Sequence, residues 1–172
     1  MVIYDRAARA SQRARPGRMF RDPDDRMKRL TASASATITA PPERAVATLE
    51  AVDRYPEWHA DVVRDVVVIE RNAAGAPTLA RAVLELALGP ASRTVELTLS
   101  VTARPNEVTL TRVPNAPSDH EELELAWQVE PGRLLLRIGA SLDVPRLLPV
   151  GSIAAQLAEG FVGAASSAID AR

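Results

Sequence analysis

Hydrophobic and polar residues alternate along most of the chain beyond residue 60, a pattern typical of β-strands that bury one face. Apolar side chains recur at every second position over residues 80–88, 93–103, 121–129 and 133–143. Three further strands are predicted where small or β-branched residues gather, at residues 33–39, 62–69 and 108–113. Turns such as Pro131-Gly132 join consecutive segments, so we expect an antiparallel sheet of about six to seven strands.

Two segments have helical spacing instead. Pro42 and Glu43 suit the first turn of a helix, and apolar residues follow at positions 45, 46, 49 and 52. A second helix is predicted over residues 152–171, where apolar residues form one stripe. At about 1.5 Å per residue this helix spans about 30 Å, enough to cross the sheet. The pattern therefore predicts an α+β domain over residues 31–172.

Composition narrows the class of protein. Of the 172 residues, 47% are apolar and 25% charged, the balance of an ordinary globular protein. There is no cysteine, which excludes disulfides and thiolate chemistry and favours a cytoplasmic location. No apolar run approaches the ~18 residues of a transmembrane helix. The six aromatic residues and an acidic body disfavour nucleic-acid binding.

Charge is distributed unevenly. Residues 1–30 carry nine Lys and Arg against four Asp, a net +5, whereas the remaining residues carry 12 against 18, a net −6. The first segment has no apolar stripe, so we expect residues 1–30 to be a basic, flexible N-terminal tail that is dispensable for folding. The alternatives are a transit peptide, weak contact with an anionic membrane surface, and translation that starts at Met19 or Met27.

Two motifs carry a family resemblance. Residues 40–46 read Ala-Pro-Pro-Glu-Arg-Ala-Val, and residues 52–58 read Val-Asp-Arg-Tyr-Pro-Glu-Trp. Together with the element order they resemble the START-like (SRPBCC) helix-grip superfamily, and within it the polyketide cyclase/dehydrase and coenzyme Q-binding branch. The resemblance covers residues 31–171. It implies a curved sheet wrapped around the C-terminal helix, with an apolar cavity between them.

Strand phase and this resemblance together select the residues that should line the cavity. Most come from the apolar faces of the predicted strands, and two come from the last helix. The predicted ligand-binding residues are Trp58, Leu84, Leu86, Leu97, Leu99, Leu110, Arg112, Leu125, Trp127, Leu136, Ile138, Leu157 and Phe161. Glutamate at Leu97 or Leu136 is expected to abolish binding.

Three polar residues are candidate sites of chemistry. Arg112 shares the inward face of its strand with Val108 and Leu110, where it either anchors a ligand oxygen or pairs with a rim carboxylate such as Glu121. His59 stands where the branch often has an apolar residue, which predicts a more polar entrance, and it is a candidate acid or base. His120 lies among acidic residues, but neighbours in extended backbone point to opposite faces, which favours a solvated loop over a metal site.

The predicted cavity lining has almost no titratable group, and this decides the functional expectation. Proton-transfer catalysis needs such a group within hydrogen-bond reach of substrate, whereas binding needs only shape and an apolar surface. We therefore expect a carrier or receptor for a hydrophobic small molecule, such as a lipid, quinone or polyketide-like compound, without a metal or cofactor. The alternatives are a polyketide cyclase/aromatase that uses the same cavity, and an interaction module with a filled core.

Overall fold

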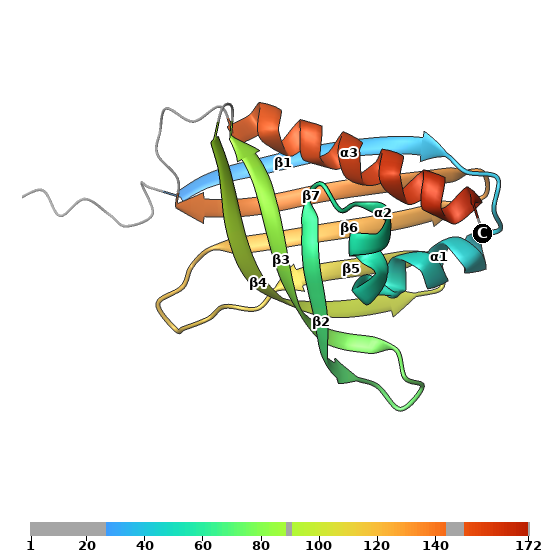
Figure 1. Cartoon of the computed structure of the whole chain (residues 1–172), viewed down its shortest axis with the longest axis horizontal. Helices are drawn as coiled ribbons and strands as arrows, with labels where there is room; N and C mark the ends of the chain where they lie inside the picture. The colour runs from blue at the N-terminus through green and yellow to red at the C-terminus, as the bar shows by residue number, and fades with distance from the viewer. Residues whose placement is uncertain (1–26, 89–90, 144–149, 172) are drawn as a thin grey trace, which may run out of the picture.

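The computed structural model describes residues 27–88, 91–143 and 150–171 (Figure 1). Its elements follow in the order β1 (Met27–Thr37), α1 (Pro42–Glu50), the 3-10 helix η2 (Val52–Arg54), α2 (Tyr55–Trp58), β2 (Val63–Arg71), β3 (Pro77–Leu88), β4 (Ala91–Arg104), β5 (Glu107–Arg112), β6 (Glu122–Glu130), β7 (Arg133–Asp143) and α3 (Val150–Asp170).

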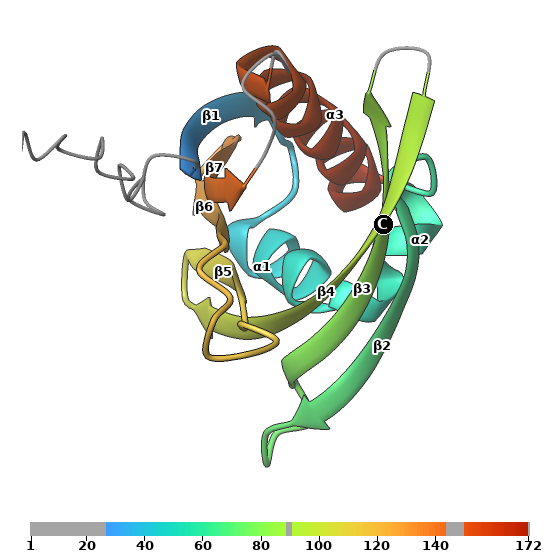
Figure 2. The ribbon, with the colours of Figure 1, turned by 90° about the vertical axis from the view of Figure 1, so that its left-hand side faces the viewer.

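All seven strands form one antiparallel sheet, in the order β1-β7-β6-β5-β4-β3-β2. Consecutive strands from β2 to β7 are neighbours, and β1 pairs with β7 at the end of the sheet. Figure 2 shows the sheet curling around α1 and α3, which lie on its concave side. This arrangement is a helix-grip fold and confirms the predicted α+β class and topology.

The first strand begins earlier than the sequence pattern predicts. Strand β1 starts at Met27, and its first four residues pair with residues 140–143 of β7. Met27–Leu30 contains two charged residues and lacks alternation, but strand pairing uses backbone groups that every residue type except proline supplies. The predicted tail therefore overlaps β1 by four residues, and the rest of it, residues 1–26, lies outside the described residues.

The segment after α1 also differs from expectation. The residue before a proline is biased away from helical backbone, so the sequence predicts that the helical pattern ends before Tyr55-Pro56. Residues 55–58 nevertheless form the short helix α2 directly after η2. Proline is tolerated in the first turn of a helix because the N–H that it lacks has no partner there. The consequence is that Tyr55 is 3% exposed and its hydroxyl donates to the Leu49 carbonyl oxygen at 2.8 Å.

Helix α3 lies along β1 and β7 on the concave side of the sheet. Its C-terminal end is held by the Asp170 carboxylate, which accepts hydrogen bonds from the backbone N–H groups of Thr39 (2.9 Å) and Ala40 (3.1 Å). These contacts lower the pKa of Asp170, the Thr39 N–H being the largest cause. The apolar stripe of α3 is thereby fixed over one half of the sheet.

In the described part of the chain, none of the helices has the length and hydropathy of a transmembrane segment.

Candidate functional site

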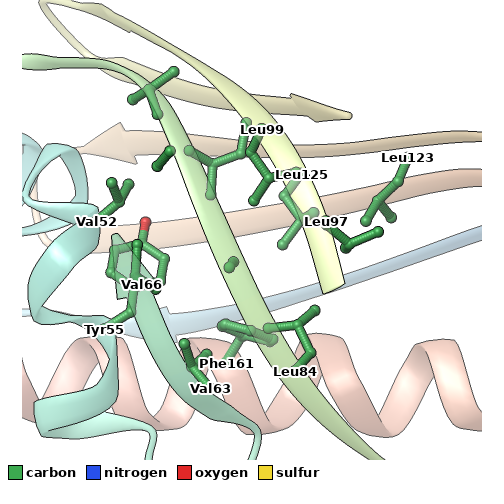
Figure 3. A pocket seen from close by; sticks show the side chains of 14 residues that line it. Val52, Tyr55, Val63, Val66, Leu84, Leu97, Leu99, Leu123, Leu125 and Phe161 are labelled. Atoms are coloured by element: carbon green, nitrogen blue, oxygen red, sulfur yellow. The ribbon is translucent and has the colours of Figure 1, made fainter. Parts of the chain in front are cut away.

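A cavity lies on the concave side of the sheet, between strands β2–β6 and the helices (Figure 3). It has a volume of about 40 Å³. Every lining side chain is aliphatic or aromatic. The lining residues are Val52, Tyr55, Val63, Val66, Ala80, Ala82, Leu84, Leu97, Leu99, Val101, Leu110, Leu123, Leu125 and Phe161.

Six of the predicted residues line this cavity, namely Leu84, Leu97, Leu99, Leu110, Leu125 and Phe161. The strand residues missed by the prediction were available from the same alternation, because Ala80, Ala82, Val101 and Leu123 share the inward faces of these strands. Val52 and Tyr55 are different. They reach the cavity through η2 and α2, whose geometry the sequence pattern did not indicate.

The other seven predicted residues lie outside the cavity lining. Trp127 and Leu136 pair across β6 and β7 and have no exposed surface, and Ile138 is 7% exposed on the same face of β7. They belong to the core beside α3 rather than to the cavity. Trp58 and Leu157 are half-buried against this core, and the remaining two are Leu86 and Arg112.

The position of α3 explains this division. Because the helix packs on β1 and β7, it fills the concave face there and leaves the β2–β5 half less covered (Figure 2). Strand β3 pairs with β2 as far as Leu84, and β4 pairs with β5 from Leu99 onward. Toward the turn between β3 and β4, the described residues of these two strands pair only with each other. Leu86 lies on this two-stranded ribbon, past the lined part of the cavity.

Arg112 does face the concave side, as the strand phase predicts. Strand β5 pairs without register shifts, and Val108 and Leu110 on the same face are buried. The guanidinium is nevertheless engaged: it donates to both carboxylate oxygens of Asp119 at 2.8 Å and to the Glu121 carbonyl oxygen at 2.6 Å. The Glu121 carboxylate lies 3.5 Å away. The pairing interpretation is confirmed, with Asp119 as the principal partner that the sequence reasoning missed.

This ion pair is shielded from solvent, since the Arg112 side chain is 7% exposed and that of Asp119 is 15% exposed. The hydrogen bond from Arg112 holds the pKa of Asp119 far below its usual 3.8, assisted by the backbone N–H of Asn115. These contacts hold the loop of residues 113–121 against the end of β5. A ligand anion would have to displace Asp119 to reach the guanidinium.

Arg112→Ala is expected to lower the melting temperature by several degrees at pH 7, because it removes both bidentate hydrogen bonds and leaves Asp119 without its cation. The folded-state pKa of Asp119 is depressed, so its contribution is present above about pH 4 and is lost as the pH falls through the folded-state value. Thermal unfolding from pH 7 to 3 should show the difference between the two proteins begin to shrink below about pH 4, and it should vanish only below the folded-state pKa of Asp119. Arg104→Ala, at an exposed arginine, is the control. An unchanged melting temperature for Arg112→Ala at pH 7 would contradict this role.

Four aromatic side chains meet where α2 approaches α3. The Tyr55 and Trp58 ring centroids are 4.4 Å apart, and the His59 ring contacts Phe161 edge-on at 4.5 Å. The His59 ring also lies beside Gly160 of α3, where a Cβ atom would be at an ordinary contact distance of 3.5 Å from its Cε1. Tyr55 and Phe161 line the cavity (Figure 3), whereas Trp58 and His59 are not among its lining residues. Burial lowers the pKa of His59 from 6.5, against a smaller opposing effect of Asp61.

The lowered pKa of His59 predicts that the stability of the protein depends on pH. Its folded-state pKa lies below the unfolded value, so the unfolded chain binds the proton more readily. The contribution of neutral His59 is present above about pH 6.5 and is lost as the pH falls. We expect the urea midpoint to fall between about pH 7 and 5, and to fall less in His59→Phe. His120→Phe, at the exposed second histidine, should behave as the parent. Equal slopes for all three proteins would refute the assignment.

The cavity has little capacity for acid–base chemistry. Tyr55 is its one titratable lining residue among those described, its hydroxyl is engaged with Leu49, and burial raises its pKa. The volume is also below the roughly 300–1,000 Å³ of pockets for drug-sized ligands. The geometry suits apolar contact, and a ligand of that size requires the walls to move.

Comparison with solved structures supports the fold. A START superfamily protein from Mycobacterium smegmatis is 16% identical, with 82% of this chain and 97% of that chain covered and a TM-score of 0.60. A protein from Thermus thermophilus is 18% identical, with 82% and 97% covered and a TM-score of 0.64. The Zhui aromatase/cyclase from a Streptomyces species is 13% identical, with 85% and 95% covered and a TM-score of 0.60. At these identities the likeness extends to the fold alone.

Comparison of the sequence with curated proteins found no match. The profile of one family, described as polyketide cyclase / dehydrase and lipid transport, matches residues 29–169. This match spans β1 to α3 and includes all the residues that line the cavity. The chain therefore belongs to the polyketide cyclase / dehydrase and lipid transport family.

Proposed function

We propose that this protein binds a hydrophobic small molecule in the cavity between the sheet and the helices. The observation that carries the proposal is the lining itself, in which fourteen aliphatic and aromatic side chains converge on one space. Apolar surface removed from water contributes roughly 25 cal/mol per Å² to binding, so a ligand of matching polarity gains affinity without any polar contact. Membership of the family supports the same function.

The alternative is a polyketide cyclase/aromatase that uses the same cavity, as the family description and the Zhui aromatase/cyclase suggest. Such an enzyme can gain much of its rate from holding the substrate in a reactive geometry. It also needs a group that moves a proton, and Tyr55, whose pKa is raised, is poorly suited. The lining therefore favours binding over catalysis. The cytoplasmic location and the surface contact of the basic segment stay predictions from the sequence.

Ligand entry has to enlarge the cavity. An apolar cavity of about 150 Å³ holds benzene, whereas this one measures about 40 Å³. Leu84 and Leu123 line the cavity and are only half-buried, so this end of the lining reaches the surface. A ligand that enters between them separates side chains and leaves the backbone pairing of the sheet intact.

The proposal is tested with N-phenyl-1-naphthylamine, an uncharged apolar dye. Titration should give saturable binding of one dye per chain, with enhanced dye fluorescence and quenching of the two tryptophans. Native mass spectrometry of protein purified from its own host should detect a co-purifying small molecule. Dye fluorescence that rises without saturation, together with ligand-free protein in the mass spectrum, would rule out the proposed function.

A further inference from the structure

Four side-chain polar atoms among the described residues are buried without a hydrogen-bond partner, namely Nε of Arg44, Nε1 of Trp58, Nε2 of His59 and Nε1 of Trp127. Two of them belong to consecutive residues, Trp58 at the end of α2 and His59 directly after it. Buried polar atoms are nearly always paired, because an unpaired one has lost its water and gained nothing in exchange. A pair of neighbouring exceptions next to an apolar cavity needs a physical reason.

Both atoms belong to rings that touch the aromatic wall of the cavity. Trp58 packs on Tyr55 with ring centroids 4.4 Å apart, and His59 packs on Phe161 at 4.5 Å. Tyr55 and Phe161 line the cavity (Figure 3). The two nitrogen-bearing rings therefore contact the aromatic wall without themselves lining the cavity. The imidazole lies beside Gly160 of α3, where a Cβ atom would be 3.5 Å from its Cε1 and 3.7 Å from its Nε2.

We propose that Trp58 and His59 form the polar end of the ligand site, and that the ligand is an apolar molecule with an uncharged carbonyl oxygen directed at their ring nitrogens. This inference rests on the proposed function. For such a ligand to reach the imidazole, the Phe161 ring, which contacts His59 edge-on, has to turn aside.

The chemistry of the two nitrogens selects the ligand group. An indole N–H can only donate a hydrogen bond, and a neutral imidazole nitrogen donates or accepts according to its tautomer. The group they share must therefore contain an acceptor. A carboxylate would need a cation in this apolar surrounding, but Arg112 is held by Asp119, and burial lowers the pKa of His59 so that it is neutral at pH 7. The ligand group must therefore accept a hydrogen bond and carry no charge, and a ketone, ester or quinone carbonyl does both.

Three probes of nearly equal shape separate these requirements: 2-acetylnaphthalene, 2-isopropenylnaphthalene and 2-naphthoate. The alkene replaces the carbonyl oxygen of the ketone by a CH₂ group, and the naphthoate carries a charge. For the parent at pH 7.5 we expect the ketone to bind about tenfold tighter than the alkene, the size expected for one or two neutral hydrogen bonds. The naphthoate should bind most weakly of the three.

Variants assign this preference to its residues. His59→Phe and Trp58→Phe keep an aromatic ring but remove the polar nitrogen, so each should reduce the ketone-to-alkene ratio to about threefold or less. His120→Phe removes the other, exposed histidine and should keep the full ratio. The circular dichroism and melting curve of each variant confirm that it is folded.

A spectroscopic readout distinguishes a hydrogen bond from a packing effect. The chain has two tryptophans, so its proton–nitrogen NMR spectrum contains two indole N–H signals, and Trp58→Phe identifies which one belongs to Trp58. The ketone should move the Trp58 signal downfield, and the alkene should not.

Each result decides one question. Equal affinity for ketone and alkene in the parent, or an unchanged ketone-to-alkene ratio in both phenylalanine variants, would contradict the proposal that Trp58 and His59 bind the ligand oxygen. Neither result would contradict the proposed function. Tightest binding of the naphthoate would overturn the claim that the ligand group is uncharged. Absence of binding by all three probes, together with no saturable dye binding, would remove the proposed function and this inference with it.

Discussion

Leu136→Glu is expected to unfold the protein at room temperature. Leu136 has no exposed surface, and its neighbours across the sheet are Ala34 on β1 and Trp127 on β6. A carboxylate there has neither water nor a cation, and its protonated form still lacks hydrogen-bond partners. Burial of an unpaired charge is one of the few mechanisms behind exceptional losses above about 4–5 kcal/mol, and the whole stability of a domain is about 5–15 kcal/mol. Loss of the near-ultraviolet circular dichroism of the tryptophans is the measurement.

The matched control is Leu135→Glu. Leu135 is the adjacent residue of β7, lies on the opposite face of the sheet, and has Arg133 and Arg137 two positions away on that face. A glutamate there is hydrated and has cations nearby, so the melting temperature should change by only a few degrees. A folded Leu136→Glu protein with a melting temperature near that of Leu135→Glu would show that the core beside α3 is not closed.

The sheet could be predicted from sequence because its evidence is local. Alternation over residues 80–88 or 133–143 specifies which side chains share a face, and short turns leave antiparallel pairing as the simplest topology. The same alternation placed Arg112 on the concave face, where it lies. Its bidentate partner Asp119 could not be predicted, because Asp119 comes from a loop whose conformation has no periodic signal.

The position of the cavity was harder to predict than the fold. Strand phase treats Leu97 and Leu136 alike, since both point to the concave side. They differ because α3 packs over β7 and leaves β4 less covered, which is a property of tertiary packing. The helical residues Val52 and Tyr55 were missed for a related reason. Their orientation depends on η2 and α2, two short elements that a helical period of 3.6 residues cannot resolve.

Leu97→Glu is expected to abolish ligand binding while the protein stays folded. Leu97 lines the cavity, is 8% exposed, and packs with Ala82 and Leu99 in a small cluster near the half-buried Leu84. A carboxylate at this position can reach water, so the loss of stability should be about 2–4 kcal/mol rather than the whole. An apolar ligand would have to bury that carboxylate, which should weaken dye binding more than a hundredfold.

Two variants make the Leu97→Glu result specific. Thr98→Glu places the same charge on the next residue of β4, on the outer face opposite Arg81, and should bind the dye as the parent does. Leu97→Met keeps an apolar side chain of similar volume and should retain binding within a few fold. Because burial raises the pKa of a carboxylate, dye binding to Leu97→Glu should partly recover as the pH is lowered from 7.5 to 5, where the side chain gains a proton. A folded Leu97→Glu protein that binds the dye with parental affinity at pH 7.5 would place the ligand outside this cavity.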